Sequence, residues 1–197
     1  MARLLFLDCE TTGLDPKTDM LLEVGMVVVE TPTFEPVAET NIVFHFDLKP
    51  TLTKDHHFQG PGRDLFIHRK VVDMHKANGL WEACKRSQLN SYRRMDELVR
   101  AWILEQGCDG SVLAGANPDF DRRFLKEKLP TTAQGLHYRN LDTNSFWLLR
   151  EFLTGESGKR AKPATHRAVD DCKDAIKAVE QHVEFMMELA ACCPPES

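Results

Sequence analysis

The chain has 197 residues, of which 42% are hydrophobic and 28% charged, and its formal net charge is −5. This composition is typical of a soluble globular domain and excludes a chain that is disordered throughout. The negative charge excludes a protein that wraps a polyanion with a broad basic field, so any nucleic-acid role must rest on local features. We expect one domain over residues 1–191 and a frayed tail over residues 192–197.

Cysteine usage and the lengths of the apolar runs favour a cytoplasmic protein. The six cysteines include no C-x-x-C spacing, and most are scattered through apolar segments, which is typical of reduced thiols in a cytosol. The longest apolar runs, residues 4–7 and 24–29, are too short to cross a bilayer, and neither has the flanks of a secretory leader. We therefore predict a cytoplasmic location and no membrane partner.

The first third of the chain predicts three antiparallel strands. An apolar run over residues 3–8 is closed by turn residues, a valine-rich segment follows over 20–30, and residues 41–48 alternate with period two. Their close spacing favours an antiparallel meander. Residues 51–62 are rich in Lys, His, Gly and Pro, which predicts a long loop.

Beyond this loop the hydrophobic period becomes helical. We predict helices over residues 64–86, 91–105, 118–129, 142–153 and 166–190, with brief strands over 111–115 and 138–141. Asn117 is expected to cap the third helix, with Pro118 in its first turn. Strands in a meander followed by strand–helix alternation predict an α/β domain. Its mixed five-stranded sheet has three antiparallel strands and then parallel strands, and helices flank it.

Two carboxylates end the first predicted strand. Because residues two apart point to the same face of a strand, Asp8 and Glu10 project together from an otherwise apolar segment. One explanation is a divalent cation, since Mg²⁺ and Mn²⁺ prefer hard oxygen ligands. The other is a strand end that emerges into water, because about one such pair is expected by chance in a chain this acidic.

Helical phase distinguishes two further acids from their neighbours. At about 100° per residue, Asp121 falls on the apolar stripe of its helix and Asp119 on the opposite side. In the last helix, Asp171 lies at the edge of the stripe whereas Asp170 points away. A carboxylate on a buried stripe is costly unless it is paired or binds a metal. For Asp121 both explanations stay open, the pair being with a neighbouring arginine.

One histidine is selected by its context. The spacing H-x₄-D begins at His68, His137 and His166, and since chance predicts about 0.6 such pairs, two of the three are expected to have other roles. His166 precedes a strongly amphipathic helix and follows a Lys-Pro-Ala-Thr segment. We expect this loop to place the imidazole outside the helix, near the carboxylates that end the first strand.

Three motifs, taken in order along the chain, resemble those of the DEDDh exonucleases. They are Asp8-Cys9-Glu10-Thr11-Thr12-Gly13-Leu14, Asn117-Pro118-Asp119-Phe120-Asp121 and His166-Arg167-Ala168-Val169-Asp170-Asp171. Within this family the chain looks most like the oligoribonuclease branch, through segments such as Asn78-Gly79-Leu80 and His137-Tyr138-Arg139-Asn140-Leu141-Asp142. The resemblance covers nearly the full length.

The resemblance implies a ribonuclease H-like fold and a metal-dependent 3′–5′ exonuclease. Asp8, Glu10, Asp121 and Asp171 would hold two Mg²⁺ or Mn²⁺ ions, and His166 would be the general base. Two divalent ions would also offset the repulsion among four crowded carboxylates. The products would be nucleoside 5′-monophosphates released from short RNA.

Substrate contacts and a homodimer are implied in the same way. Leu14 would pack on the terminal bases, and Asn117 would hydrogen-bond the terminal nucleotide. His75, His137 and Tyr138 would bind the 5′ phosphate of the short strand, the last two reaching across from a partner subunit. For each of these positions a structural role stays open, such as a core leucine, a helix cap or an interface aromatic.

Substrate preference has alternatives. Lys70 stands where the oligoribonucleases carry a tryptophan that wedges against a base, which leaves single-stranded DNA or longer RNA as substrates of the same chemistry. A rival from another class is a non-catalytic nucleic-acid-binding module with the nuclease fold. The complete set of four acids and His166 argues against that rival.

Overall fold

A mixed five-stranded sheet forms the centre of the computed structural model, which describes residues 3–46, 49–50, 57–60, 63–155 and 165–192. Its strands are β1 (Arg3–Thr11), β2 (Leu21–Glu30), β3 (Glu35–Val43), β7 (Leu113–Gly115) and β8 (Asn140–Asp142). They lie in the order β3-β2-β1-β7-β8. The first three pair antiparallel, whereas β7 pairs parallel with β1 and with β8. The predicted mixed sheet is therefore confirmed.

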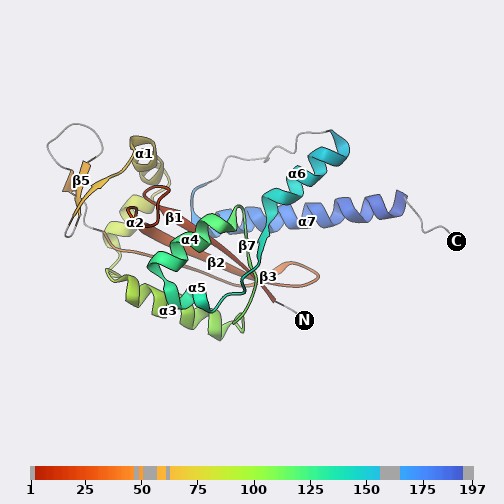
Figure 1. The fold of residues 1–197 in the computed structure, drawn as a ribbon, viewed down its shortest axis with the longest axis horizontal. Coiled ribbons are helices and arrows are strands. Elements are labelled where there is room, and N and C mark those ends of the chain that lie inside the picture. The colour runs from red at the N-terminus through yellow and green to blue at the C-terminus, as the bar shows by residue number, and fades with distance from the viewer. Residues whose placement is uncertain (1–2, 47–48, 51–56, 61–62, 156–164, 193–197) are drawn as a thin grey trace.

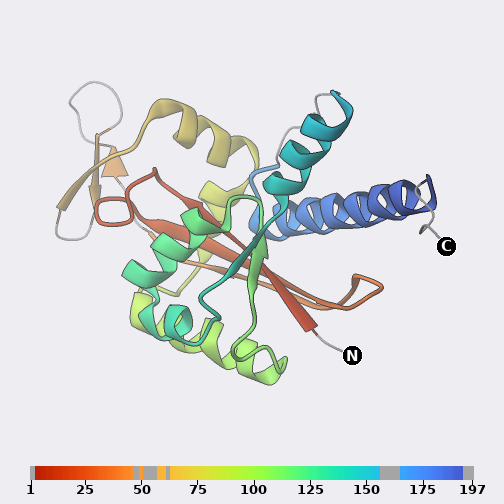
Figure 2. The same ribbon diagram turned by 45° about the vertical axis from the view of Figure 1, so that its right-hand side comes forward.

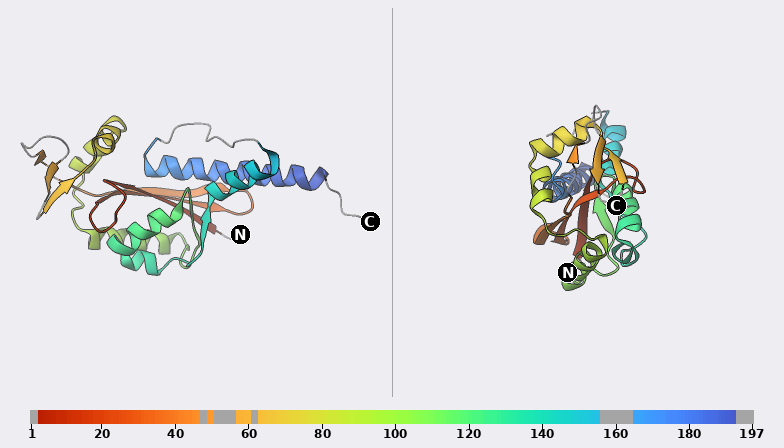
Figure 3. Two further views of the ribbon diagram at one scale, coloured as in Figure 1. Left: turned by 45° about the horizontal axis from the view of Figure 1, so that its top comes forward. Right: turned by 90° about the vertical axis from the view of Figure 1, so that its left-hand side faces the viewer.

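Helices cover both faces of this sheet (Figures 1 and 3). They are α1 (Arg69–Ala77), α2 (Leu80–Arg86), α3 (Tyr92–Glu105), α4 (Pro118–Lys128), α5 (Pro130–Gln134), α6 (Thr143–Thr154) and α7 (Ala168–Cys192). The left view of Figure 3 shows α7 along one face and α3, α4 and α5 on the other. α6 and α7 extend beyond the sheet and diverge from each other (Figure 2). No helix within the described ranges is long and apolar enough to span a membrane.

The apolar character of β1 follows from this double cover. Phe6 packs in the cluster that includes Ile176 of α7, whereas Leu5 and Leu7 belong to the cluster on the opposite face. All three strand residues are completely buried, and burying such a side chain contributes about 2 kcal/mol. A strand buried on both faces reads as a continuous apolar run. The carboxylates Asp8 and Glu10 therefore interrupt the run only where β1 reaches its carboxyl end.

The long helix predicted over residues 64–86 is wrong. Residues Arg63–Phe66 form strand β6, and the remainder divides into α1 and α2 at Asn78 and Gly79. Gly79 has a φ of 79°, which glycine adopts without steric cost and which ends a helix. The apolar period continues through this break because both helices bury residues against the same core.

The loop predicted over residues 51–62 is partly a strand. His57–Gly60 forms β5, which pairs with β6 and with the short β4 (Lys49–Pro50) in a second, three-stranded sheet. The rest of that loop lies outside the described residues. So does the expected frayed tail, apart from Cys192 at the end of α7.

The third strand lies earlier than the predicted residues 41–48: β3 begins at Glu35 and ends at Val43. Phe44 and Phe46, which the alternation places on the same side of the segment, are buried beyond the end of the sheet. Phe44 stacks on Tyr92 with ring centroids 4.2 Å apart, and Phe46 meets Trp81 edge-on at 4.7 Å. The two phenylalanines that share one side of the alternation are therefore both buried, while the sheet itself ends sooner.

Candidate active site

A pocket of about 380 Å³ opens at the carboxyl end of β1. Its lining includes every residue predicted to be catalytic, namely Asp8, Glu10, Asp121, His166 and Asp171. These residues come from three separate segments: the end of β1, the first turn of α4, and the residues at the start of α7. In open α/β sheets, ligands bind where the carboxyl ends of parallel strands meet, and β1 and β7 are such a pair.

The end of β1 places two carboxylates on the face of the sheet that α7 covers. Asp8 lies opposite Gly25 of β2, and Glu10 lies opposite Glu23. The register shifts between Glu10 and Thr11, and such a bulge turns the strand locally and re-aims its side chains. Both carboxylates line the pocket; Glu10 is buried and Asp8 is half-buried.

α4 contributes a carboxylate from the other face of the sheet. Asp121 is 2% exposed, and its Oδ1 accepts a hydrogen bond from the backbone N–H of Cys9 at 2.8 Å. Asp119 is exposed and pairs with Arg123 at 3.5 Å. The side chain of Arg122 instead donates to Asn140. The predicted helical phase is confirmed, and the neighbouring arginines have partners other than Asp121.

α7 packs unusually close to β2 at its first turn. A Cβ atom on Gly25 would lie 2.5 Å from the backbone carbon of Ala168, so only glycine permits this approach. Asp171 is buried on this helix while Asp170 is exposed, as the helical phase predicts. The close approach therefore brings the carboxylate of Asp171 to the face on which Glu10 lies.

His166 lies immediately before α7, as the sequence predicts. Its φ of 54° lies in the left-handed region, which costs roughly 1–3 kcal/mol for a residue other than glycine unless its surroundings impose it. The side-chain amide of Asn78 donates a hydrogen bond to the carbonyl oxygen of His166. Ligand atoms of His166, Glu10 and Asp171 all lie within 4.8 Å of one another.

The electrostatics of the pocket favour a bound cation. Burial, and next the nearby Asp171, raise the pKa of Glu10 to about 8. Burial raises the pKa of Asp121 to about 7. These carboxyls therefore hold protons that a metal ion would displace. Carboxylate oxygens with one imidazole form a donor set that suits a hard divalent cation. In the described part of the chain the tight group consists of Glu10, His166 and Asp171, and Asp8 and Asp121 line the same pocket outside it.

The pocket also has apolar lining, part of which the sequence did not indicate. Leu14 is 77% exposed and lines the pocket, so it is not a core leucine. Phe120 lines it as well, together with Val71 and Met74 of α1. The last two lie three residues apart, so they share one face of the helix. That spacing is the only local signal in the sequence that Val71 and Met74 act together, and it does not indicate that their face of α1 meets the pocket.

Asn117 lines the pocket at the start of α4. It is the N-cap residue, as predicted, but its side chain makes no capping hydrogen bond. Its backbone N–H donates to Asp142 at 3.0 Å, and its φ of 62° is left-handed, a conformation that asparagine tolerates well. The structure thus leaves the amide of Asn117 exposed at the pocket.

The structure places His75 elsewhere than the resemblance implied. This histidine is completely buried and does not line the pocket. Its Nε2 hydrogen-bonds the carbonyl oxygen of Thr11 at 2.9 Å, and its Nδ1 lies 4.0 Å from Glu10 Oε2. The observed contact of His75 supports the end of β1, because the helical phase of α1 turns this side chain toward the core.

His137 and Tyr138 also lie outside the lining of the pocket in their own chain. Tyr138 is 74% exposed, and its ring lies 4.5 Å from that of His137. In each of the other two H-x₄-D pairs, one member caps a helix. His68 caps α1, and Asp142 caps α6.

Comparison with known proteins identifies the chain's family. Residues 5–179, most of the chain, match the family model RNase_T, described as Exonuclease. The chain belongs to the exonuclease family. This exonuclease is 27% identical to the oligoribonuclease of Pseudomonas savastanoi pv. phaseolicola, over 94% of this chain and 96% of that relative. It is 29% identical to the oligoribonuclease of Hydrogenovibrio crunogenus, over 91% of each chain.

Solved structures agree on the fold. Exonuclease I from Methylocaldum szegediense aligns with a TM-score of 0.59 at 16% identity, over 94% of this exonuclease and 41% of that chain. E. coli exonuclease I in complex with a 5cy-dT13 oligonucleotide aligns with a TM-score of 0.61 at 13% identity, over 98% of this exonuclease and 46% of that chain. This exonuclease spans less than half the length of those two chains. The predicted ribonuclease H-like fold is confirmed.

Proposed function

We propose that this exonuclease degrades short RNA from its 3′ end and releases nucleoside 5′-monophosphates. The observation that carries the proposal is the single pocket into which β1, α4 and the start of α7 bring four carboxylates and one histidine. Relatives named oligoribonuclease that match over nearly the whole of both chains support short RNA as the substrate. The fold alone would fit many substrates.

We infer that Asp8, Glu10, Asp121 and Asp171 hold two divalent ions, Mg²⁺ or Mn²⁺. Such ions, when bound, activate water and stabilise charge on the phosphate. The raised pKa values of Glu10 and Asp121 support this assignment, because buried carboxylates of this kind need compensating positive charge. Asp121 is held for this role by its bond to Cys9.

His166 is proposed to accept the proton of the attacking water. An imidazole takes up a proton near neutral pH, which a carboxylate committed to a cation does poorly. His166 lies with Glu10 and Asp171 yet outside α7, so its ring is separate from the helix that carries the last acid. The side chain is not buried, which leaves its ring in reach of water.

The remaining lining suits a terminal nucleotide. The apolar side chains of Leu14, Val71, Met74 and Phe120 offer surface to a base. Among the described residues that line the pocket there is no lysine or arginine. A substrate with few phosphates, neutralised mainly by bound metal, therefore fits both the pocket and the net charge of −5.

We further propose that the exonuclease is a homodimer whose partner completes the site. Large apolar side chains are exposed along α6 and α7, namely Leu148, Leu149, Phe152, Leu153, Val183, Met186, Met187 and Leu189. These two helices extend beyond the sheet (Figure 2), and an apolar patch of this kind marks an interface. Tyr138 is exposed and does not line the pocket of its own chain. In a homodimer it would reach the pocket of the partner subunit.

The location proposed for this exonuclease is the cytoplasm. Cys9, Cys84, Cys108 and Cys172 are free and buried, which supports a reducing compartment. Microscopy of the tagged protein in its source cell would test this, and a secreted protein would contradict it.

A substrate panel tests the function. An end-labelled RNA dinucleotide, a longer RNA and single-stranded DNA are each incubated with the protein in Mn²⁺ or in chelator. We expect the dinucleotide to be hydrolysed fastest, to mononucleotides, and only with metal. Faster hydrolysis of DNA or long RNA would overturn the substrate class. Hydrolysis in chelator would overturn the role of metal, and no hydrolysis of any substrate would favour a binding module.

A further inference from the structure

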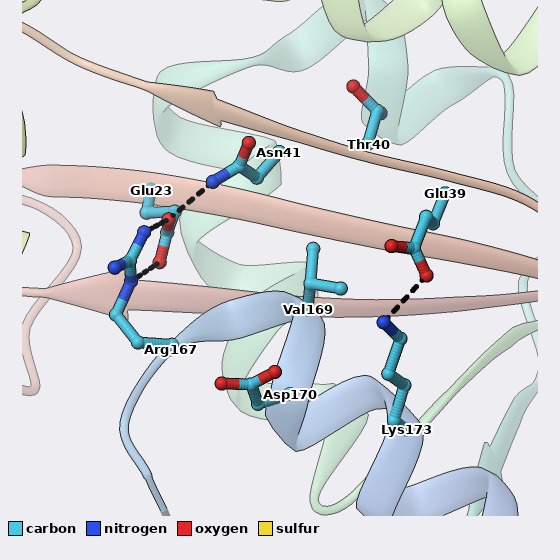
Figure 4. A pocket seen from close by; sticks show the side chains of 8 residues that line it. All are labelled: Glu23, Glu39, Thr40, Asn41, Arg167, Val169, Asp170 and Lys173. Atoms are coloured by element: carbon cyan, nitrogen blue, oxygen red, sulfur yellow. Dashed lines mark hydrogen bonds and ion pairs between the residues drawn. The ribbon is translucent and has the colours of Figure 1, made fainter.

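A second groove, of about 520 Å³, lies between β2, β3 and the start of α7 (Figure 4). One residue of its lining, Glu23, is 1% exposed although it is an acid in an apolar strand. Glu23 accepts hydrogen bonds from Arg167 at 2.8 and 3.2 Å and from the side-chain amide of Asn41 at 3.0 Å. A buried carboxylate requires such partners.

Glu23 also holds the backbone at the start of α7. The backbone N–H of Ala168 donates to Glu23 Oε2 at 3.1 Å. The first N–H groups of a helix have no partner within the helix, so a carboxylate from β2 here replaces an ordinary N-cap and meets the positive end of the helix dipole. Glu23 thus binds the two residues that directly follow His166.

A second side chain holds His166 from the other side. Asn78, at the end of α1, donates its amide to the carbonyl oxygen of His166. Its Oδ1 accepts from the backbone N–H of Leu80 at 3.0 Å, which orients the amide. The left-handed backbone at His166 is thus anchored on both sides, and a strained residue persists only where its surroundings impose it.

We propose that Glu23 and Asn78 are positioning residues for the imidazole of His166. This inference rests on the proposed function, in which His166 accepts the proton of water. Neither Glu23 nor Asn78 lines the pocket that holds the four acids. Glu23 lies opposite Glu10 and its charge also acts on that carboxyl, whereas the influence of Glu23 and Asn78 on His166 passes through the backbone of the segment between them. A displacement of about 1 Å at a reacting group lowers the rate strongly.

Two conservative variants test the anchors separately. Glu23→Gln keeps the shape of the side chain and removes its charge toward Arg167. Asn78→Asp keeps the acceptor for Leu80 and removes the donor to His166. With RNA dinucleotide and Mn²⁺, we expect kcat to fall roughly 10- to 100-fold in each variant while KM changes less than about twofold. Equal changes in kcat and KM, or no change in kcat, would overturn the inference.

The same groove offers a matched control. Lys173 of α7 pairs with Glu39 of β3 at 2.7 Å, an ion pair that also joins α7 to the sheet (Figure 4). It lies beyond the first turn of α7, away from His166. We expect Lys173→Met to leave kcat within about twofold of the parent. A loss in Lys173→Met as large as that in Glu23→Gln would show that any weakening of α7 suffices, and would overturn the inference.

The His166→Ala background separates this inference from the proposed function. If Glu23 and Asn78 act through His166, their substitutions cause little further loss of kcat once His166 is alanine. Additive losses would overturn the positioning role while leaving His166 as the base. Full activity of the single variant His166→Ala would instead overturn the base assignment itself.

A readout without turnover completes the test. In metal-free protein, the imidazole NMR signals of His166 are those that disappear in His166→Ala. We expect them to shift or broaden in Glu23→Gln and Asn78→Asp and to stay unchanged in Lys173→Met. Thermal unfolding of each variant checks that it folds, and unchanged His166 signals in folded Glu23→Gln and Asn78→Asp would overturn the inference.

Discussion

Asp119 and Asp121 lie two residues apart in α4 and have opposite surroundings. Asp119 is exposed and pairs with Arg123, whereas Asp121 is buried and bound to the backbone of Cys9. Only Asp121 bears a cost of burial, which raises its pKa to about 7. A costly buried charge retained at a pocket is a common mark of a functional group.

We expect Asp121→Asn to lower kcat by roughly a hundredfold or more, because it removes a proposed metal ligand. The melting temperature of the metal-free variant should equal or exceed that of the parent, since a buried carboxyl is removed. The matched variant Asp119→Asn should keep kcat within about twofold. Steady-state kinetics on an RNA dinucleotide and thermal unfolding in chelator measure both effects, and equal loss of kcat in the two variants would contradict the assignment.

The raised pKa values of Glu10 and Asp121 also set how stability depends on pH. Folding raises both values above those of the unfolded chain, to about 8 and about 7. At a pH between the unfolded and the folded pKa values of these two carboxyls, the folded metal-free protein therefore binds more protons than the unfolded chain. The stabilisation is complete below the unfolded pKa values near 4 and is lost as pH rises through the folded ones.

In chelator, we expect the melting temperature to fall as pH rises from about 5 to about 8. Added Mn²⁺ should stabilise the protein more at pH 8 than at pH 5, because a cation competes with protons for these carboxyls. Glu10→Gln should flatten the dependence in chelator. A melting temperature that rises across this range in chelator, in the parent protein, would contradict the assigned shifts.

Among the elements, α7 does the most to assemble the pocket. It brings Asp171 to the sheet from one face, and α4 brings Asp121 from the other. The contact between the first turn of α7 and Gly25 of β2 sets how closely the helix approaches the sheet. Because protein interiors are close-packed, an added methyl group there cannot be absorbed without moving the helix.

Gly25→Ala is expected to cost roughly 1–3 kcal/mol of stability and to abolish most of the activity of the protein that remains folded. Gly110→Ala is the control. Unlike Gly25, Gly110 has a positive φ, of 70°, so an alanine is strained there, but no atom lies within 4 Å of an added Cβ. It should lose stability without losing activity per folded molecule. Chemical denaturation and kcat are measured for both variants. A fully active Gly25→Ala would show that the close approach of α7 to the sheet is not critical for activity.

In the molecule as a whole, α6 and α7 extend away from the sheet (Figures 1 and 2). Both helices carry exposed apolar side chains. Phe152 is 84% exposed there. The proposed homodimer would cover such side chains and place Tyr138 at the pocket of the other subunit. Two single defects, one at the acids and one at Tyr138, would then lie in different active sites of a mixed dimer.

Mixing Asp121→Asn with Tyr138→Ala after subunit exchange should restore about one quarter of the parent activity, since half of the dimers carry one intact site. Mixing Asp121→Asn with Glu10→Gln is the control. It should restore nothing, because each active site takes all its acids from one subunit, so both sites of the mixed dimer lack an acid. Analytical ultracentrifugation confirms the dimer. No recovery in an exchanging dimer would refute the shared site, and a monomeric parent would refute the dimer.

Local periodicity was sufficient to predict much of this protein. Period two placed Asp8 and Glu10 on one face, and helical phase separated Asp121 from Asp119. The order of strands and helices predicted the mixed sheet. These features are local because the direction of a side chain repeats every two residues in a strand and every 3.6 in a helix. This periodicity does not depend on which element packs against that face.

Only the tertiary structure decided which elements meet. Glu23 lies in an apolar strand, and its partner Arg167 is 144 residues away, so no local pattern joins them. Val71 and Met74 became pocket lining, and His75 became a core residue, because α1 folds against the end of β1. A hydrophobic period shows which face of an element is buried, whereas the partner of that face depends on contacts distant in sequence.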